Sequence, residues 1–515
     1  MRCDTLRPKV MSRVAITLAL AASGLLAQAP TPGPLIRLYP VALDASGQPV
    51  TDLTADDFKI VDQSKAEPIF LFHEPRTGAP PKLDVLEFSN RTNAAKPHAA
   101  VILFDLMNQN APDRLEMWKA LDKSLPQLES GEFLYFYILT LEGELVAIHP
   151  IGPRAPDDAT WPHDVVPALD KAMKAASHGR PVQLGQEDQA KKTFHQLEVL
   201  AGQLAVFPGR RDIIWIANGF QNAYNNKLPC NGDWVDCALY VPHLAVTLAQ
   251  ANVAVNPLSN GRDVATGTSG INAMDTRTNL GKPISGGGNQ GMVSNQSAQG
   301  ADPALDLTQM ARLTGGHAYF RQDLQTVVKQ VATDANSTYE MAYAPSADNW
   351  DNKFHVIHLT TTRPGLKVQV RERYYALADT RTPLERTKAV LMEAFQNQMD
   401  HSEIGLRAKF APLDGKPGVH LEIHIDAADL MLRRGDAGKY SSAIYCLISD
   451  RNATSPLGEP TVLDLHPELT PEQYKAVQKE GFPLAQDHPT AAGIVRVIIL
   501  DQNTDRVGSL TFPVK

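Results

Sequence analysis

One carboxylate stands at the end of an apolar run and is followed closely by amides. Residues 99–104 are all apolar, Asp105 ends the run, and Asn108, Gln109 and Asn110 come next. Carboxylate and amide oxygens suit Mg²⁺, so a divalent-metal site is one explanation of this grouping. A site that has lost its metal is a second. Capping of the following helix is a third, because Asn and Asp accept hydrogen bonds from the first N–H groups of a helix.

The elements that would position Asp105 alternate between apolar strands and amphipathic helices. Strand patterns occur at 99–105, 133–140, 145–150, 212–218, 252–258 and 316–320, and helical patterns at 113–126, 163–176, 188–206, 241–251, 303–313 and 322–335. This alternation predicts an α/β fold with a mainly parallel sheet. The second and third strands are joined only by "LEGE", so we expect a hairpin and one antiparallel edge strand.

Short strands with turns are expected on either side of this region. Residues 34–75 hold three or four such strands and residues 339–376 hold three, too few in either case to bury two faces. We therefore expect the two segments to share one β-sandwich, with two independent modules as the alternative. Residues 76–97 are interpreted as a linker or irregular edge, and 382–398 as a helix and linker.

The expected organisation has five parts. They are a signal peptide (1–29), an N-terminal β segment (30–97), an α/β domain (98–338, with a flexible insertion at 260–300), β strands at 339–378 and a C-terminal β-sandwich (379–515).

The first residues have the pattern of a secretory signal. Four basic residues precede the apolar stretch 14–26, which is too short to cross a bilayer of about 30 Å, and Ala27-Gln28-Ala29 follows it. Met11 is an alternative start. Removing the signal takes a net +3 from the formal charge of −8, leaving about −11. We expect a secreted or periplasmic protein without a later transmembrane segment, and an acidic mature chain argues against nucleic acid as its main partner.

Two cysteines are close enough in the sequence to form a short loop. Cys230 and Cys237 bracket "NGDWVD", and an oxidising compartment favours a disulfide between them. Such a loop would present Trp234 to a partner. Cys446 lies in an apolar strand and is expected to be a buried thiol.

Two further patterns have an ordinary and a metal-binding interpretation. "HLEIHID" at 420–426 places polar residues on one face of a strand, where they could hold zinc or copper or simply face solvent. "DQNTDR" at 501–506 begins like a calcium loop, but Arg506 stands where that loop needs glycine, so we expect a hairpin turn.

A set of stretches, in order, resembles the von Willebrand factor type A domain, specifically the VWFA-related group of exported acidobacterial proteins. The stretches are "VTDLTADDFKIVDQ", "VILFDLMN", "GRRDIIWIANGF", "ANVAVNPLS", "MARLTGGHAYF", "STYEMAYAP" and "PGLKVQVRERYYA", and the tail from "LTPEQYKAVQKEG" onward resembles the β-domain often found after it. The resemblance spans nearly the whole mature chain. It implies a doubly wound, Rossmann-like sheet that binds ligands at the carboxyl ends of its strands, near the point where the strand order reverses.

The resemblance also implies a metal-ion-dependent adhesion site, built from Asp-x-Ser-x-Ser, a Thr and a second Asp. Asp105 matches the first Asp, but Met107 and Gln109 stand at the two Ser positions, and a thioether is a poor Mg²⁺ ligand. The second Asp position falls on Asn218. Thr193 is the nearest candidate for the Thr and is expected on a helix.

The implied site is therefore degenerate, with Asp105, Asn108, Asn110 and Asn218 as its remaining residues. Asn108 matches an Asn that the group often carries at this position. We expect no cofactor, with bound Mg²⁺ as the alternative.

These observations favour an exported, non-enzymatic protein of the binding or adhesion type, whose protein partner the sequence does not identify. The alternatives are a Mg²⁺-dependent adhesion protein, a structural component of an envelope assembly, and a hydrolase.

Overall fold

The computed structural model describes the chain in segments. They are residues 35–75, 83–84, 87–91, 98–128, 134–152, 161–178, 186–218, 244, 247–249, 251–260, 303–345, 350–351, 353–377, 381–435, 437–451, 456–490 and 493–514. The fold is mixed α/β, with one mixed sheet and several antiparallel sheets. The expected signal peptide and nearly all of the expected insertion at 260–300 lie outside the described residues. Within the described segments, no helix is long and apolar enough to cross a membrane.

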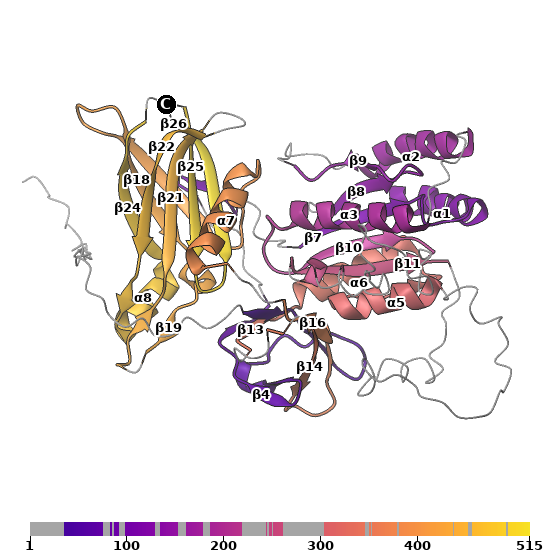
Figure 1. The fold of residues 1–515 in the computed structure, drawn as a ribbon, viewed down its shortest axis with the longest axis horizontal. Coiled ribbons are helices and arrows are strands. Elements are labelled where there is room, and N and C mark those ends of the chain that lie inside the picture. Colours follow the sequence, from indigo (N-terminus) through magenta and orange to yellow (C-terminus); the bar gives the residue numbers. More distant parts are fainter. Residues whose placement is uncertain are drawn as a thin grey trace, which may run out of the picture. The chain divides into compact units, whose positions relative to one another are not determined.

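The mixed sheet has six strands in the order β12-β11-β10-β7-β8-β9 (Figure 1). The strands are β7 (Ala99–Asp105), β8 (Leu134–Leu139), β9 (Leu145–His149), β10 (Arg211–Ile216), β11 (Val253–Ser259) and β12 (Tyr319–Phe320). Neighbouring strands run parallel except β9, which pairs antiparallel with β8. The predicted hairpin and antiparallel edge strand are confirmed. Within this sheet the chain first forms the central strand β7, then β8 and β9 on one side, and then β10, β11 and β12 on the other side. The strand order therefore reverses between β7 and β10.

Helices cover both faces of this sheet. On one face lie α1 (Ala111–Ser124), α2 (Trp161–His178) and α6 (Leu324–Asn336), and on the other lie α3 (Gln186–Leu204) and α5 (Pro303–Thr314). Residues of β7 alternate between the two cores: Val101 and Leu103 face α3, whereas Ile102 and Phe104 face α1. Because both faces are buried, the strands read as continuous apolar runs rather than alternating ones.

The segments 34–75 and 339–376 share their sheets. β13 (Glu340–Tyr343) pairs with β1 (Ile36–Leu38) and β5 (Leu71–His73), and β15 (Lys367–Gln369) pairs with β2 (Val41–Leu43). A four-stranded sheet has the order β16 (Arg373–Tyr375), β14 (Phe354–Thr361), β3 (Phe58–Asp62) and β4 (Lys65–Glu67). Both segments contribute to one apolar core. We call this part the split β region.

The C-terminal region consists of two four-stranded antiparallel sheets around one core. One sheet has β24 (Phe482–His488), β18 (Val419–Ile425), β17 (Leu406–Pro412) and β6 (Phe88–Ser89), and the other has β22 (Pro456–Leu465), β21 (Ile444–Arg451), β25 (Gly493–Asp501) and β26 (Arg506–Val514). A small sheet joins β19 (Arg433–Arg434), β20 (Tyr440–Ser441) and β23 (Glu468–Leu469).

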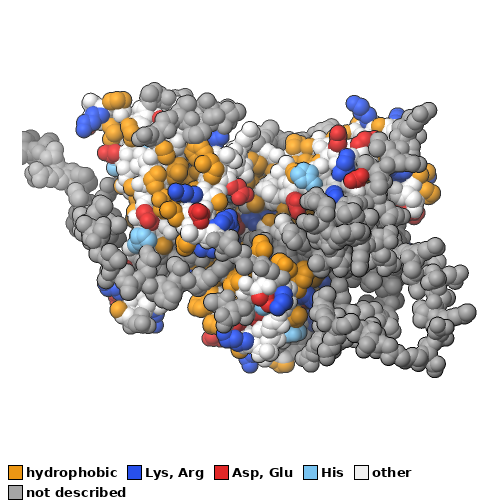
Figure 2. Space-filling view, viewed as in Figure 1, with side chains coloured by type: hydrophobic (Ala, Val, Ile, Leu, Met, Phe, Trp, Pro, Cys, Tyr) orange, Lys and Arg blue, Asp and Glu red, His pale blue; other side chains and the backbone are white. Residues whose placement is uncertain are grey.

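Two helices accompany these sheets. α7 (Pro383–Gln396) packs on the outer face of β25, and α8 (Pro471–Glu480) begins with a capping box at Thr470. Some apolar side chains stay exposed on this region, among them Met392 and Val462. Figure 2 shows orange side chains over part of the face that the molecule presents in that view. Exposure of some apolar side chains is ordinary for a folded surface.

Several expectations for this region can be compared with the structure. The turn at 501–506 is a hairpin, since Asp501 pairs with Arg506 at the end of β25 and β26. The residues of β18 alternate between buried and more exposed, as predicted for "HLEIHID". Cys446 is buried with a free thiol, as predicted. The interpretation of 76–97 as a linker or irregular edge was incomplete, because β6 extends the sheet of β17. Two residues are too few to carry a strand pattern of their own.

Candidate functional site

Asp105 is the last residue of β7 and lies where the strand order of the mixed sheet reverses. Its neighbours in the sheet are β8 and β10, and its side chain is fully buried. We call this end of the sheet the carboxyl edge, because the parallel strands finish there. Crevices at such a reversal are the usual ligand sites of open α/β sheets.

Three N–H groups donate to the Asp105 carboxylate. The Asn108 backbone N–H donates to Oδ1 at 2.9 Å, and the Asn108 Nδ2 donates to Oδ2 at 2.6 Å. The indole Nε1 of Trp215, on β10, donates to Oδ2 at 2.9 Å. Burial raises the pKa of Asp105, although these hydrogen bonds act in the opposite direction. The carboxylate is therefore held by neutral dipoles.

Helix α3 supports the loop from outside. The Asn108 Nδ2 also lies 2.8 Å from Thr193 Oγ1, whose hydroxyl donates to the Gln189 carbonyl at 2.9 Å. Gln189 Nε2 in turn donates to the Met107 carbonyl at 2.7 Å. Thr193 lies on a helix, as expected, yet its hydroxyl reaches the loop that follows β7. Sequence reasoning named Thr193 only as the nearest candidate and did not anticipate this contact.

Gln109 ties the two central strands together. Its Nε2 donates to the carbonyl oxygens of Asp105, at 2.6 Å, and Ile216, at 3.0 Å. Its Oε1 is buried and has no hydrogen-bond partner within the described part of the chain. Met107, at the other Ser position, buries its side chain in the α3 face of the core. Neither side chain therefore stands in for a serine hydroxyl.

Asn110 and Asn218 have partners other than Asp105. Asn110 caps α1: its Oδ1 accepts from the Asp113 backbone N–H at 2.9 Å, and its Nδ2 donates to the Asp113 carboxylate at 2.7 Å. Asn218 Oδ1 accepts from Ser259 Oγ at 2.8 Å and from the Asn260 N–H at 3.2 Å, so it links the ends of β10 and β11. The structure thus brings Asp105 and Asn108 together, whereas the other two amides form hydrogen bonds with other neighbouring residues.

The remaining candidates lie outside the described residues. Cys230, Cys237 and Trp234 belong to the segment after Asn218 that the structure does not describe, so the disulfide and the docking role stay predictions. Trp215 was not singled out from the sequence. The available signal was a tryptophan in the core strand "DIIWIAN", since a buried indole N–H usually needs an acceptor.

No cluster of three or more His, Cys, Asp or Glu side chains suited to a metal ion occurs in the described segments. Among the described residues at the carboxyl edge, the Asp105 carboxylate already accepts from N–H groups, and the Asp113 carboxylate accepts from Asn110.

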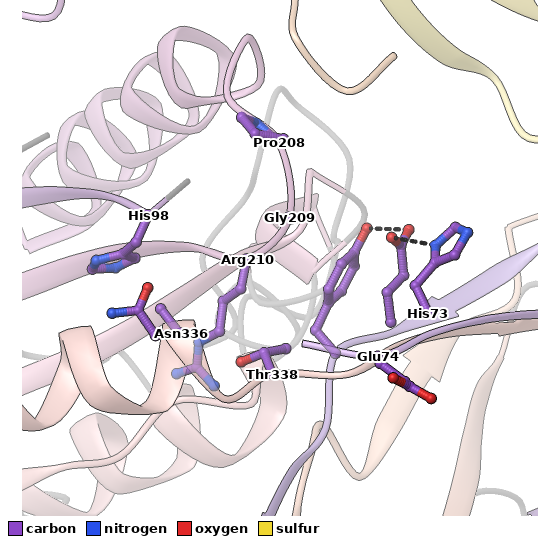
Figure 3. A pocket seen from close by; sticks show the side chains of 11 residues that line it. His73, Glu74, His98, Pro208, Gly209, Arg210, Asn336 and Thr338 are labelled. Atoms are coloured by element: carbon purple, nitrogen blue, oxygen red, sulfur yellow. Dashed lines mark hydrogen bonds and ion pairs between the residues drawn. The ribbon is translucent and has the colours of Figure 1, made fainter. Parts of the chain in front are cut away.

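A second buried aspartate lies at the opposite end of β10. Asp212 accepts from Arg210 Nη2 at 3.0 Å, from Asn256 Nδ2 at 2.7 Å, and contacts His98 Nε2 at 3.1 Å. Burial would raise its pKa, but Arg210 and His98 outweigh burial and lower it. A cavity of about 40 Å³ lies beside this group, lined by His98, Arg210 and residues of the split β region (Figure 3). That volume suits a few water molecules rather than a metabolite.

Comparison with known proteins adds no family to this description. No protein-family model matches the chain, and no curated protein sequence matches it.

Proposed function

We propose that this chain is an exported, non-enzymatic binding protein, that its mixed sheet is a doubly wound type A-like domain, and that its carboxyl edge meets a protein partner without a bound metal. The strand order β12-β11-β10-β7-β8-β9, with β9 alone antiparallel, supports the type A-like assignment. The ordered stretches of sequence that resemble this family support it independently. The basic and apolar N-terminal pattern supports export.

The observation that carries the metal-free proposal is the hydrogen bonding of Asp105. Mg²⁺ needs about six oxygen ligands near 2.1 Å. Here three N–H groups of Asn108 and Trp215 occupy most of the roughly four acceptor positions of the carboxylate. The same bonds make Asp105 unsuitable as a catalytic base, since its carboxylate is fully buried and already accepts three N–H groups.

Among the described residues of the carboxyl edge, amide side chains are accessible to a partner. Asn110 is exposed and Asn218 is half-buried. Amides both donate and accept hydrogen bonds, so they suit the backbone and polar side chains of a protein surface. In this proposal Asp105 is a structural brace that holds the loop of Asn108 in one conformation for such a partner.

A magnesium titration tests the metal-free part of the proposal. Calorimetry of the wild-type chain should show no saturable binding of Mg²⁺ up to roughly millimolar concentration, because ligation would require displacing three hydrogen bonds. Asp105→Ala should give the same flat titration. Micromolar affinity in the wild type that is lost in Asp105→Ala would overturn the proposal and support the Mg²⁺-dependent alternative.

An affinity capture from the native envelope tests the binding part. The same partner should be retained with and without a chelator, and Asn110→Arg at the carboxyl edge should reduce its recovery. Asn336→Arg is the matched control, because Asn336 is also exposed but lies beside the cavity at the other end of the sheet. Equal loss in both variants, or loss only with chelator, would contradict the proposal.

A further inference from the structure

Glu403 stands where three parts of the chain meet. It belongs to the segment between α7 and β17, and its side chain is only 13% exposed. Its Oε1 accepts from Arg211 Nη2 at 2.9 Å and from Arg37 Nη1 at 3.3 Å. Arg211 begins β10 of the mixed sheet, whereas Arg37 lies on β1 of the split β region. A single carboxylate therefore joins guanidinium groups from two other parts of the chain.

Both arginines are held firmly by their own surroundings. Arg211 also donates to the backbone carbonyls of Phe207, at a short distance, and of Ala251, at 2.9 Å. Arg37 also donates to the Thr504 carbonyl, in the hairpin between β25 and β26. Burial would raise the pKa of Glu403, but Arg211 and Arg37 outweigh burial and lower it. Glu403 is thus an ionised carboxylate in a buried position.

A second buried carboxylate lies on the same boundary. Glu340, on β13, pairs with Arg506 of β26, and it also accepts from the Tyr39 hydroxyl and contacts His73. Figure 3 marks the contact of His73 with a dashed line. Burial opposes its ionisation, but Arg506 and His73 hold the pKa of Glu340 well below its usual range. This pair joins only the split β region and the C-terminal region. Of the two carboxylates, Glu403 is the one that forms an ion pair with the mixed sheet.

We propose that Glu403, Arg37 and Arg211 form an ionic clasp that holds the mixed sheet against the two β regions. Each arm comes from a different part of the chain, so loss of the central carboxylate removes both ion pairs at once. A buried arginine without its carboxylate is strongly unfavourable, and the local structure would open to hydrate it. The clasp is therefore a conformational device, and its release loosens the attachment of the mixed sheet to the two β regions without unfolding the sheet.

Hydrogen exchange on the full chain tests the clasp. Glu403→Gln should raise amide exchange by at least about tenfold around residues 36–39, 206–212 and 402–405, since the lost pair is buried. The strands β21 and β25 should keep their wild-type exchange. Unchanged exchange in the three segments would overturn the proposal, and so would an equal rise in β21 and β25, which would mean a loss of global stability only.

An exposed pair that joins a helix of the mixed sheet to the split β region is the matched control. Arg312 of α5 contacts Glu372, which precedes β16, at 2.6 Å, with side chains 46% and 50% exposed. Exposed ion pairs contribute little, so Glu372→Gln should change exchange by less than about twofold. An effect as large as that of Glu403→Gln would overturn the special role of Glu403.

Arg37→Met removes one arm and keeps Glu403 paired with Arg211. Exchange should rise around 36–39 and 402–405, while 206–212 should keep its wild-type rate. A rise in all three segments, or in none, would contradict the clasp, and this variant decides the question if Glu403→Gln does not fold.

Discussion

Asp105 and Asp212 are two fully buried carboxylates at opposite ends of neighbouring strands, and they are stabilised in different ways. Asp212 has charged or chargeable partners, Arg210 and His98, which lower its pKa. In the part of the chain that the structure describes, the donors to Asp105 are neutral groups of Asn108 and Trp215, and burial raises its pKa. Equal burial therefore leads to opposite shifts, because a neighbouring cation compensates a carboxylate more strongly than amide dipoles do.

The difference shows what each end of the sheet is suited for. Asp212 and Arg210 satisfy each other's charge, so that end is fixed by its own ion pair. The Asp105 end holds its loop through weaker, neutral bonds that depend on three separate elements, β7, β10 and α3. In the proposed function, this network of neutral bonds holds the loop of Asn108 in one conformation for a partner.

The largest expected effect comes from neutralising Asp212. Asp212→Asn leaves the buried Arg210 guanidinium without its carboxylate, which should reduce the free energy of unfolding by about 3–5 kcal/mol. Asp105→Asn leaves no buried cation. It should reduce the free energy of unfolding by only about 1–3 kcal/mol, because the new amide N–H group would face another hydrogen-bond donor. Urea denaturation of both variants measures the two losses. A greater loss for Asp105→Asn would break the comparison.

The pH dependence of stability should have opposite signs for the two carboxylates. Asp212 has a lowered pKa, so its contribution is present above the ordinary value of 3.8 and is lost as the pH falls below it. Asp105 has a raised pKa, so the folded state takes up a proton more readily than the unfolded state. Its contribution is complete below 3.8 and is lost as the pH rises through the raised pKa.

Unfolding measured at several pH values between about 7 and 3 tests these signs. Relative to Asp105→Asn, the wild type should gain stability as the pH falls toward 3.8. Relative to Asp212→Asn, it should lose stability as the pH falls below 3.8. Slopes of the same sign in both comparisons would contradict the assignment of neutral donors to one site and cations to the other.

The sequence predicted the features that depend on residues close to one another in the chain. The apolar runs of β7 and β10 indicated a doubly covered sheet, and "LEGE" indicated the hairpin of β8 and β9. The capping explanation raised for the amides after Asp105 is confirmed for Asn110. Asn108 is only three residues from Asp105, so a local hydrogen bond was within reach of sequence reasoning.

The rest depends on contacts that only the folded chain creates. Trp215 and Thr193 reach the Asp105 loop from β10 and α3, and nothing in their own neighbourhood shows which residue each will contact. The strand β24 was not predicted, because "FPLAQDH" contains proline and polar residues and gains its place from pairing with β18. The two halves of the split β region could be argued together only from the shortage of strands in each.

The smallest expected effect concerns the support from α3. Thr193 is fully buried, and its hydroxyl accepts from Asn108 Nδ2 at 2.8 Å. Thr193→Val removes this acceptor, but Asn108 keeps its 2.6 Å bond to Asp105, so the loss in the free energy of unfolding should be about 1 kcal/mol. Denaturant unfolding measures it.

A second buried threonine on the same face of the sheet provides the matched control. Thr314 Oγ1, at the end of α5, accepts from the Val255 backbone N–H at 2.9 Å. Thr314→Val takes away the acceptor of a buried backbone donor, which should cost more, about 2 kcal/mol. If Thr193→Val costs as much, then Asn108 depends on α3 rather than on Asp105, and the aspartate is not the centre of the network at the carboxyl edge.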